Sequence, residues 1–331
     1  MSETPLVSVV MAVYNGVCEG EDGLAGTIES LRSQTFRDFE LIIIDDGSTD
    51  ATWEWLSRLE FPRLRVHRNT TNRGQTASLN LGLSMARGRY IARHDAEDIS
   101  LPERFEKQVA FLEKHAEVAL VGTQVEWMDR AGETVRRFEY PTDHEAIVER
   151  LKRKNSFGHG AVMVRREALD KTGPYREAFR LAQDYDLWLR LSERYRVANL
   201  PDVLYRMRFS ARMASVARNG EQNAYAELAR RLAAERAEHG EEKTDLPTAV
   251  EAIRERYDRM NFLSRRIERA RNYINWAERL LWWGGPAARY AWPMWSYALS
   301  EWPLNPRIWK FAARQALRRL TSGAEARPAS E

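Results

Sequence analysis

Three carboxylates, Asp95, Glu97 and Asp98, lie within four consecutive residues of the sequence. The apolar residues 90–92 before them favour a β-strand, and Ser100 begins the S-x-x-E pattern of a helix capping box. We therefore expect the carboxylates at the carboxyl end of a strand, the edge at which open α/β sheets bind ligands. Crowded carboxylates repel one another, and a divalent ion that holds a phosphate would relieve this repulsion. The alternative is a solvated acidic turn before a well-capped helix.

Two further carboxylates are expected at the same edge. Asp46 follows a buried strand and could accept the imide N–H of a pyrimidine, or form an Asx turn that caps the next helix. Asp184 lies in or just before the first turn of a helix, where the helix dipole favours its ionised form. It could act as a general base toward a bound sugar, or serve only as an N-cap.

The elements that would position these carboxylates alternate along the first hundred residues. Apolar, β-branched runs predict strands at 6–13, 39–44, 64–67 and 90–92, and amphipathic runs predict helices between them. This alternation indicates a doubly wound parallel sheet. Beyond it we expect a helix at 101–115, a hairpin of 118–125 and 134–140, a helix at 143–154, a Gly-flanked loop at 157–160, strands at 161–164 and 203–209, and only helix from about 211.

The composition indicates a soluble globular protein of the cytoplasm. Of the 331 residues, 44% are hydrophobic and 30% are charged, which argues against disorder. Cys18 is the only cysteine, so no intramolecular disulfide can form and a thiolate metal site is not expected. The sequence shows no signal peptide and no apolar run of about 18 residues, so we expect no membrane span.

Several motifs occur in a fixed order along the first 210 residues. They are VSVVMAVYN at 7–15, SLRSQTF at 30–36, FELIIIDDGSTD at 39–50, NRG at 72–74, ARGRYIA at 86–92, the acidic stretch, His159 with MVRR at 163–166, and QDYDLWLR at 183–190. Together they resemble the family 2 glycosyltransferases. The resemblance implies the GT-A fold, an α/β Rossmann-like doubly wound mixed sheet. It would form a catalytic domain of residues 1–210, with a nucleotide-sugar half at about 1–100 and an acceptor half at about 101–210.

The resemblance also implies which residues bind the nucleotide-sugar. Asp46 would contact the uracil ring and Asp95 the ribose. Glu97, together with Asp95, would hold Mn²⁺ or Mg²⁺ on the diphosphate. The residues implied at the nucleotide are Ala12, Tyr14, Asn15, Asp46, Gly74 and Asp95.

On the acceptor side, the resemblance implies that Asp184 deprotonates the acceptor hydroxyl in an inverting displacement. His159, Gln183 and Trp188 would lie nearby, although a lone histidine such as His159 could equally be structural. The sequence departs from the family pattern at Glu97, where Asp is usual, and at Gln183, which replaces an acidic residue. The loop at 16–26 is also longer than is typical.

The expected activity is transfer of a sugar from a nucleotide-sugar, such as a UDP-sugar, to a glycan or lipid-linked acceptor in surface polysaccharide synthesis. Two alternatives stay open. A nucleotidyltransferase would need a Gly-rich loop with Lys or Arg near the first strand, and 16–26 contains no basic residue. A nucleotide-sugar-binding protein without activity would be expected to have lost Asp184, which is present.

We expect residues 211–331 to form a basic, Trp-rich and α-helical C-terminal extension. Residues 206–331 carry 23 Lys+Arg against 15 Asp+Glu, a net charge of +8, whereas 1–205 carry 28 against 33, or −5. Aromatic and basic residues on one helix face suit a peripheral contact with anionic lipid at the inner face of the membrane. Alternatively the tryptophans pack between helices while the arginines reach outward. Nucleic-acid binding is not expected, because no recognised module accompanies the charge.

Overall fold

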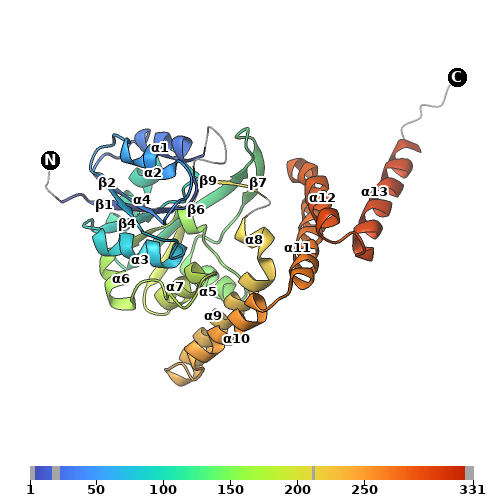
Figure 1. Ribbon diagram of the computed structural model, residues 1–331. Helices are drawn as coiled ribbons and strands as arrows, with labels where there is room; N and C mark the ends of the chain where they lie inside the picture. The colour runs from blue at the N-terminus through green and yellow to red at the C-terminus, as the bar shows by residue number, and fades with distance from the viewer. Residues whose placement is uncertain (1–3, 17–22, 211–212, 325–331) are drawn as a thin grey trace. The chain divides into compact units, whose positions relative to one another are not determined.

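The computed structural model describes residues 4–16, 23–210 and 213–324 (Figure 1). Cys18 and the rest of 17–22, which belong to the lengthened loop, lie outside the described residues. The chain divides into two compact units. The first contains 1–209 with 223–251, and the second contains 210–222 with 252–331.

The first unit is built on a mixed sheet with nine strands among its described residues. The strands lie in the order β3-β2-β1-β4-β8-β6-β9-β5, and β7 pairs with β6. β1 is parallel to β2 and β4, whereas β8 is antiparallel to β4 and β6. The doubly wound mixed sheet expected from the sequence is thus confirmed. The bounds are β1 (Val7–Val13), β2 (Phe39–Asp45), β3 (Leu64–Arg68), β4 (Tyr90–Arg93), β5 (Ile99–Ser100), β6 (Val118–Met128), β7 (Thr134–Phe138), β8 (Met163–Arg165) and β9 (Arg196–Arg208).

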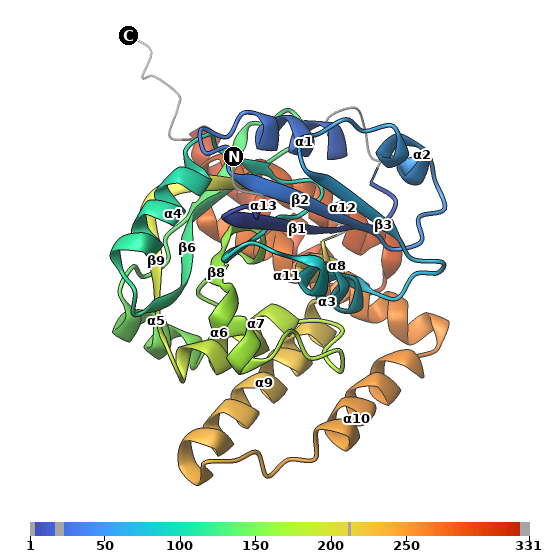
Figure 2. The same ribbon diagram turned by 90° about the vertical axis from the view of Figure 1, so that its left-hand side faces the viewer.

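β1 and β2 lie inside the sheet because they are apolar on both faces, as the sequence predicts. Val9 and Met11 of β1 belong to the core formed with α1 (Leu24–Arg32) and α4 (Arg104–Lys114), while Val10 lies beneath Gly82 of α3 (Gln75–Met85). Figure 2 shows the two layers, with α1 and α2 (Thr52–Ser57) on one side of the sheet and α3, α6 (Arg166–Thr172) and α7 (Gln183–Ser192) on the other.

The second half of the first unit contains the expected β6–β7 hairpin, α5 (His144–Leu151) and the short 3-10 helix η1 (His159–Ala161). The expectation that Ser100 caps a helix is wrong. Ser100 lies in β5, which pairs with β9, and α4 begins only at Arg104. The Ser100 hydroxyl instead accepts a hydrogen bond from Arg104 Nη1 at 2.9 Å. The Ser100 hydroxyl is thus bonded to a buried guanidinium, whereas the capping pattern predicts a bond to a backbone N–H.

After β9 the described residues form only helices, as expected. Residues 223–251 of this helical region belong to the first unit, so the region is not a single separate domain. Tyr225 lies 5.9 Å from the ring of Phe179, and Arg236 pairs with Glu193 at 2.6 Å. The bounds are α8 (Ala214–Ala217), α9 (Asn219–His239), α10 (Leu246–Asp258), α11 (Phe262–Trp283), the 3-10 helix η2 (Gly285–Tyr290), α12 (Ala291–Glu301) and α13 (Pro306–Ala324).

The second unit is held together by packing between helices. Tyr273 of α11 lies 5.4 Å from Tyr297 of α12, and Arg269 pairs with Glu301 at 2.7 Å. The Trp276 indole donates to the carbonyl of a residue in α8. Trp276, Trp292 and Trp295 therefore pack between helices, one of the two alternatives left open by the sequence, whereas Trp282 and Trp309 are exposed. No helix in the described part of the chain is both long and apolar enough to cross a membrane.

Candidate active site

Asn15 ties together the carboxyl ends of β1 and β2. Its positive φ of 53° turns the chain out of β1. Its N–H donates to Ser48 Oγ at 2.9 Å, and its Oδ1 accepts the N–H of Thr49 at 2.9 Å. Ala12 is half-buried at the same edge, and the Tyr14 side chain is 48% exposed. This edge therefore presents an aromatic ring on a fixed turn.

Asp46 is buried, and its carboxylate shapes the loop that follows β3. Oδ1 accepts from Asn69 Nδ2 and Ser78 Oγ at 2.8 Å and from the N–H of Arg73 at 2.9 Å. Oδ2 accepts the N–H of Gly74 at 2.8 Å, and Gly74 has a φ of +90°, which favours glycine. These contacts leave acceptor capacity on Oδ2, so Asp46 could both hold the loop and accept an N–H from a base.

A chain of hydrogen bonds runs from Asp95 to the start of α7. Arg93 Nη2 donates to Asp95 Oδ1 at 2.6 Å, and the N–H of Asp95 donates to the Tyr205 hydroxyl at 3.0 Å. Gln75 Nε2 donates to the same Oδ1 at 3.4 Å, while its Oε1 accepts from Gln183 Nε2 at 2.9 Å. The structure thus connects a carboxylate at the end of β4 with the helix that carries the expected base.

The other two carboxylates of the acidic stretch have different surroundings. Glu97 is half-buried, and its backbone carbonyl accepts from Arg208 Nε at 3.2 Å. Asp98 is buried, and its Oδ1 accepts the N–H of Arg208 at 2.8 Å. Burial, and then the negative charge of Asp95, raises the pKa of Asp98 to about 8. Asp98 therefore joins the turn to β9, and a solvated acidic turn is not what the structure contains.

The described residues bring together no group of three or more His, Cys, Asp or Glu side chains that could hold a metal. Mg²⁺ bound with a nucleotide takes only one or two protein carboxylates, and phosphate oxygens and water complete its shell. Asp95 and Glu97 fit such a donor set. Burial works to raise the pKa of Asp95, but the Arg93 guanidinium holds it below its ordinary value, so the carboxylate is ionised.

Two buried arginines, Arg93 and Arg104, form a basic layer next to Asp95. Arg104 is wholly buried, donates to the carbonyls of Arg93 and Val162, and lies 4.7 Å over the Tyr205 ring. Burial lowers the pKa of Arg104 to about 10, so it stays charged at neutral pH. No role for this layer was predicted from the sequence. Its one visible signal was Arg93, a charged residue at the end of an otherwise apolar strand, where burial demands a partner.

On the acceptor side, Asp184 accepts a hydrogen bond from Asn155 Nδ2 at 2.7 Å. His159 Nε2 lies 2.9 Å from the Tyr175 hydroxyl, and burial, followed by a neighbouring guanidinium, lowers the pKa of His159 to about 4. Trp188 is wholly buried, with its ring packed edge-on against His159 and Tyr175. It supports these two side chains from within the core and presents no surface to an acceptor.

The two N-cap alternatives are wrong. The N-terminus of α2 is served by Asp50, whose Oδ1 accepts the N–H of Thr52 at 3.0 Å, and the Asp46 carboxylate makes its bonds elsewhere. The N-cap of α7 is Ala182, in the left-handed conformation, and Asp184 lies within the first turn. Both carboxylates are therefore placed for something other than helix capping.

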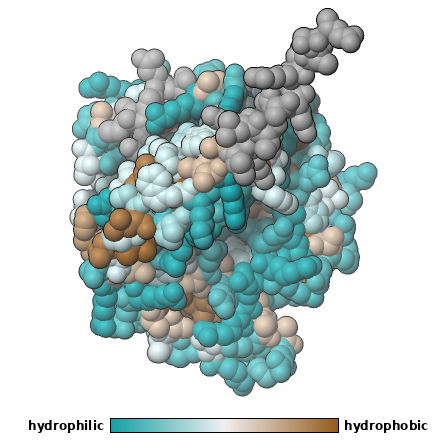
Figure 3. Space-filling model, turned by 90° about the vertical axis from the view of Figure 1, so that its right-hand side faces the viewer, coloured by the Kyte–Doolittle hydropathy of each residue, from teal (hydrophilic) through white to brown (hydrophobic). Residues whose placement is uncertain are grey.

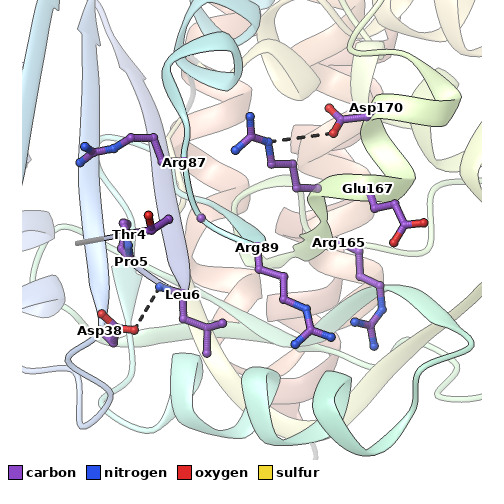
Figure 4. A pocket seen from close by; sticks show the side chains of 11 residues that line it. Thr4, Pro5, Leu6, Asp38, Arg87, Arg89, Arg165, Glu167 and Asp170 are labelled. Atoms are coloured by element: carbon purple, nitrogen blue, oxygen red, sulfur yellow. Dashed lines mark hydrogen bonds and ion pairs between the residues drawn. The ribbon is translucent and has the colours of Figure 1, made fainter. Parts of the chain in front are cut away.

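A cavity of about 670 Å³ lies at the opposite edge of the sheet (Figure 4). It is lined by residues at the amino end of β1 and before β4, including Arg87 and Arg89. Arg87 Nη2 pairs with buried Glu40 at 3.0 Å, and Arg89 pairs with Glu113 at 3.0 Å. These guanidinium groups are bound to carboxylates of the fold, and the cavity is separate from the carboxylates at the carboxyl edge.

A mixed sheet between two layers of helices, with carboxylates at the carboxyl ends of its parallel strands, is the GT-A architecture of glycosyltransferases. Residues 8–173 match glycosyl transferase family 2. The chain is 40% identical over 214 residues to the glycosyltransferase EpsE of Bacillus subtilis, covering 63% of this chain and 74% of EpsE. It is 34% identical over 215 residues to the amylovoran biosynthesis glycosyltransferase AmsE of Erwinia amylovora, covering 63% and 78%. The chain belongs to glycosyl transferase family 2.

A solved structure shares the fold at low sequence identity. TarS 1–349 of S. aureus, in complex with UDP-GlcNAc, aligns over 94% of this chain and 92% of its own, with a TM-score of 0.56 and 16% identity. At that identity the likeness concerns the fold alone. The protein is accordingly a glycosyltransferase with the GT-A fold, and its relatives include an enzyme of polysaccharide biosynthesis.

Proposed function

We propose that the protein is an inverting, metal-dependent glycosyltransferase that uses a UDP-sugar. The observation that carries this proposal is the hydrogen-bond chain from Asp95 through Gln75 to Gln183, beside Asp184. It links the edge that would bind the donor to the helix that would activate the acceptor. The UDP-GlcNAc complex of TarS supports the choice of donor, because that protein shares the fold.

The donor would lie along the carboxyl ends of β1, β2 and β4. The Tyr14 ring would face the base, Asp46 would accept its imide N–H, and Asp95 would contact the ribose. Glu97 and Asp95 would hold a divalent cation, Mn²⁺ or Mg²⁺. When bound, this cation supplies positive charge that stabilises the leaving diphosphate. Arg93 keeps Asp95 ionised and oriented for both contacts.

Asp184 would accept the proton of the acceptor hydroxyl as that oxygen attacks the anomeric carbon from the face opposite the leaving group. One displacement of this kind inverts the anomeric configuration. Asn155 donates to Asp184 Oδ2, which fixes the carboxylate and leaves Oδ1 for the acceptor. His159, neutral because its pKa is lowered to about 4, would line the acceptor side without competing for the proton.

In this proposal residues 1–100 bind the nucleotide-sugar, residues 101–210 bind the acceptor, and 211–331 form a helical extension, of which 223–251 belong to the same compact unit as the catalytic residues. The acceptor would be a glycan or a lipid-linked sugar in surface polysaccharide synthesis, made in the cytoplasm at the inner face of the membrane. The amylovoran biosynthesis role in the name of AmsE supports this class of acceptor.

Thermal-shift measurements against a panel of nucleotide-sugars, with and without Mn²⁺, test the proposal. We expect UDP-sugars to raise the melting temperature in the presence of Mn²⁺. In calorimetry, Glu97→Ala should lose metal-dependent UDP binding, whereas Glu103→Ala, which removes an exposed carboxylate paired with Lys107, should retain it. Equal UDP affinity of the Glu97→Ala variant and the parent protein would rule out the metal-binding role.

A further inference from the structure

The exposed hydrophobic side chains of this protein are concentrated in its second unit. In the part of the chain that the structure describes, eight large hydrophobic side chains are exposed, and seven of them lie between 262 and 309. Figure 3 shows one face of the molecule, on which hydrophobic side chains occur in small groups among hydrophilic ones. A monomeric protein rarely exposes several large apolar side chains together unless they meet a partner.

Five of the seven side chains lie either at the start of α11 or at the turn from α12 into α13. Phe262, Leu263 and Ile267 lie in the first turns of α11. Leu304 is 75% exposed in the connection between α12 and α13, and Trp309 is 53% exposed in the first turn of α13. We call these five residues the apolar end.

The contacts between the helices bring the end of α12, just before Leu304, to the start of α11. Arg266 and Arg269 near the start of α11 pair with Glu301, the last residue of α12, at 3.4 and 2.7 Å. Leu304 follows three residues later. The Trp309 indole donates to the carbonyl of Pro303 at 2.7 Å, which places its ring beside Leu304. Arg307 in the first turn of α13 pairs with Glu278 in the second half of α11 at 2.6 Å, so the end of α12 meets the start of α11 while α13 begins farther along α11.

The charge of this region is strongly positive. Residues 252–331 carry 15 Lys+Arg against 7 Asp+Glu, a net charge of +8, while 1–251 carry 36 against 41, or −5. Arg265 is exposed beside Phe262 and Leu263, and Lys310 is exposed beside Trp309. Basic residues that flank exposed aromatic and aliphatic side chains match an anionic, partly apolar surface.

We propose that the apolar end docks on the surface of an anionic lipid bilayer, with its five side chains at the level of the lipid headgroups. The tryptophan and phenylalanine rings would enter the boundary between headgroups and acyl chains, and the nearby Arg and Lys side chains would contact lipid phosphates. Charge complementarity favours this occupant over a symmetric pairing of two apolar ends, which would bring a second +8 unit against the first. The proposal rests on the proposed function in one respect, since a lipid-linked acceptor would give the contact its use.

Vesicle co-sedimentation of the full chain tests this inference. The parent protein should bind vesicles of phosphatidylcholine with phosphatidylglycerol and should not bind phosphatidylcholine alone. The triple variant Leu263→Ser, Leu304→Ser, Trp309→Ser should bind the anionic vesicles at least about tenfold more weakly, because three apolar anchors are removed. Circular dichroism confirms that the variant is folded.

Trp282→Ser is the matched control. Trp282 is 82% exposed but lies at the far end of α11, about 30 Å from Phe262 at 1.5 Å per residue. This variant should bind vesicles as the parent does. Failure of the parent protein to bind anionic vesicles, or equal losses in the triple and Trp282→Ser variants, would overturn the assignment. So would self-association of the parent in sedimentation velocity that the triple variant abolishes. Vesicle binding requires no nucleotide, so its outcome is independent of the UDP-binding experiments.

Discussion

Replacing Asp46 by Asn should destabilise the first unit markedly, because its carboxylate holds the loop after β3. The two oxygens accept four hydrogen bonds, and two of the donors, Asn69 Nδ2 and Ser78 Oγ, are buried. An amide nitrogen in place of either oxygen would face an N–H or O–H donor. Hydrogen bonds to a charged group contribute about 1.5–3 kcal/mol each, and a buried donor left unpaired costs about 1–3 kcal/mol. We therefore expect Asp46→Asn to lower the free energy of unfolding by about 2–4 kcal/mol.

Urea unfolding followed by tryptophan fluorescence measures this change. Asn72→Ala is the matched control, because exposed Asn72 also accepts the N–H of Gly74, at 3.1 Å, from the same loop. We expect this control to lose less than about 1 kcal/mol, since water can replace an exposed acceptor. If Asp46→Asn were as stable as Asn72→Ala and yet lost UDP binding, Asp46 would be a ligand contact alone and the reasoning about the loop would be refuted.

Three further predictions concern the residues around Asp95. Burial lowers the pKa of His159 to about 4, so below the ordinary value of 6.5 the unfolded chain binds a proton that the folded chain refuses. The free energy of unfolding should have its full value above pH 6.5 and should fall toward pH 4. Measured at pH 7 and pH 5, His159→Gln should lose less of this free energy than the parent protein, and an equal loss would contradict the prediction. Gly160→Ala would place a Cβ 2.1 Å from the Tyr205 hydroxyl and 2.9 Å from Asp95 Oδ2. We therefore expect about 1–3 kcal/mol of destabilisation and weaker UDP binding. Unchanged stability and UDP affinity would mean that the site shifts freely to accept the methyl group. Gln75→Ala should lower the turnover number at least about tenfold without changing the melting temperature, and unchanged turnover would mean that the hydrogen-bond chain positions nothing.

The strands of the first half could be predicted from the sequence because their composition is sufficient. β1 and β2 are buried on both faces and are therefore nearly continuous apolar runs. Alternation with helices then places Asp46 and Asp95 at one edge of a parallel sheet. The polar partners of these residues could not be predicted in the same way. Gln75 meets Gln183, 108 residues later in the sequence, and no local pattern encodes such a contact.

Where a prediction from the sequence was wrong, a contact between residues far apart in the sequence replaced the local contact that the pattern predicts. Ser100 fits a capping box, yet it pairs with Tyr205 in the sheet and its hydroxyl accepts a hydrogen bond from Arg104. The division of the C-terminal helices between two units depends likewise on long-range pairs such as Arg236 with Glu193. Trp188 shares the helix of Asp184, but only the packing in three dimensions shows that its ring points into the core.

Sugar transfer by Asp184→Asn tests the central claim most directly. The parent protein, Asp184→Asn and the control Asp170→Asn, whose carboxylate is exposed on α6, would be given a radiolabelled UDP-sugar that the protein binds and a membrane extract as the source of acceptor. Asp184→Asn should transfer sugar about 10²- to 10⁴-fold more slowly than the parent, because the base is lost, while its UDP affinity stays unchanged. Asp170→Asn should transfer at the parent rate. Transfer by Asp184→Asn at the rate of the parent protein would contradict the account.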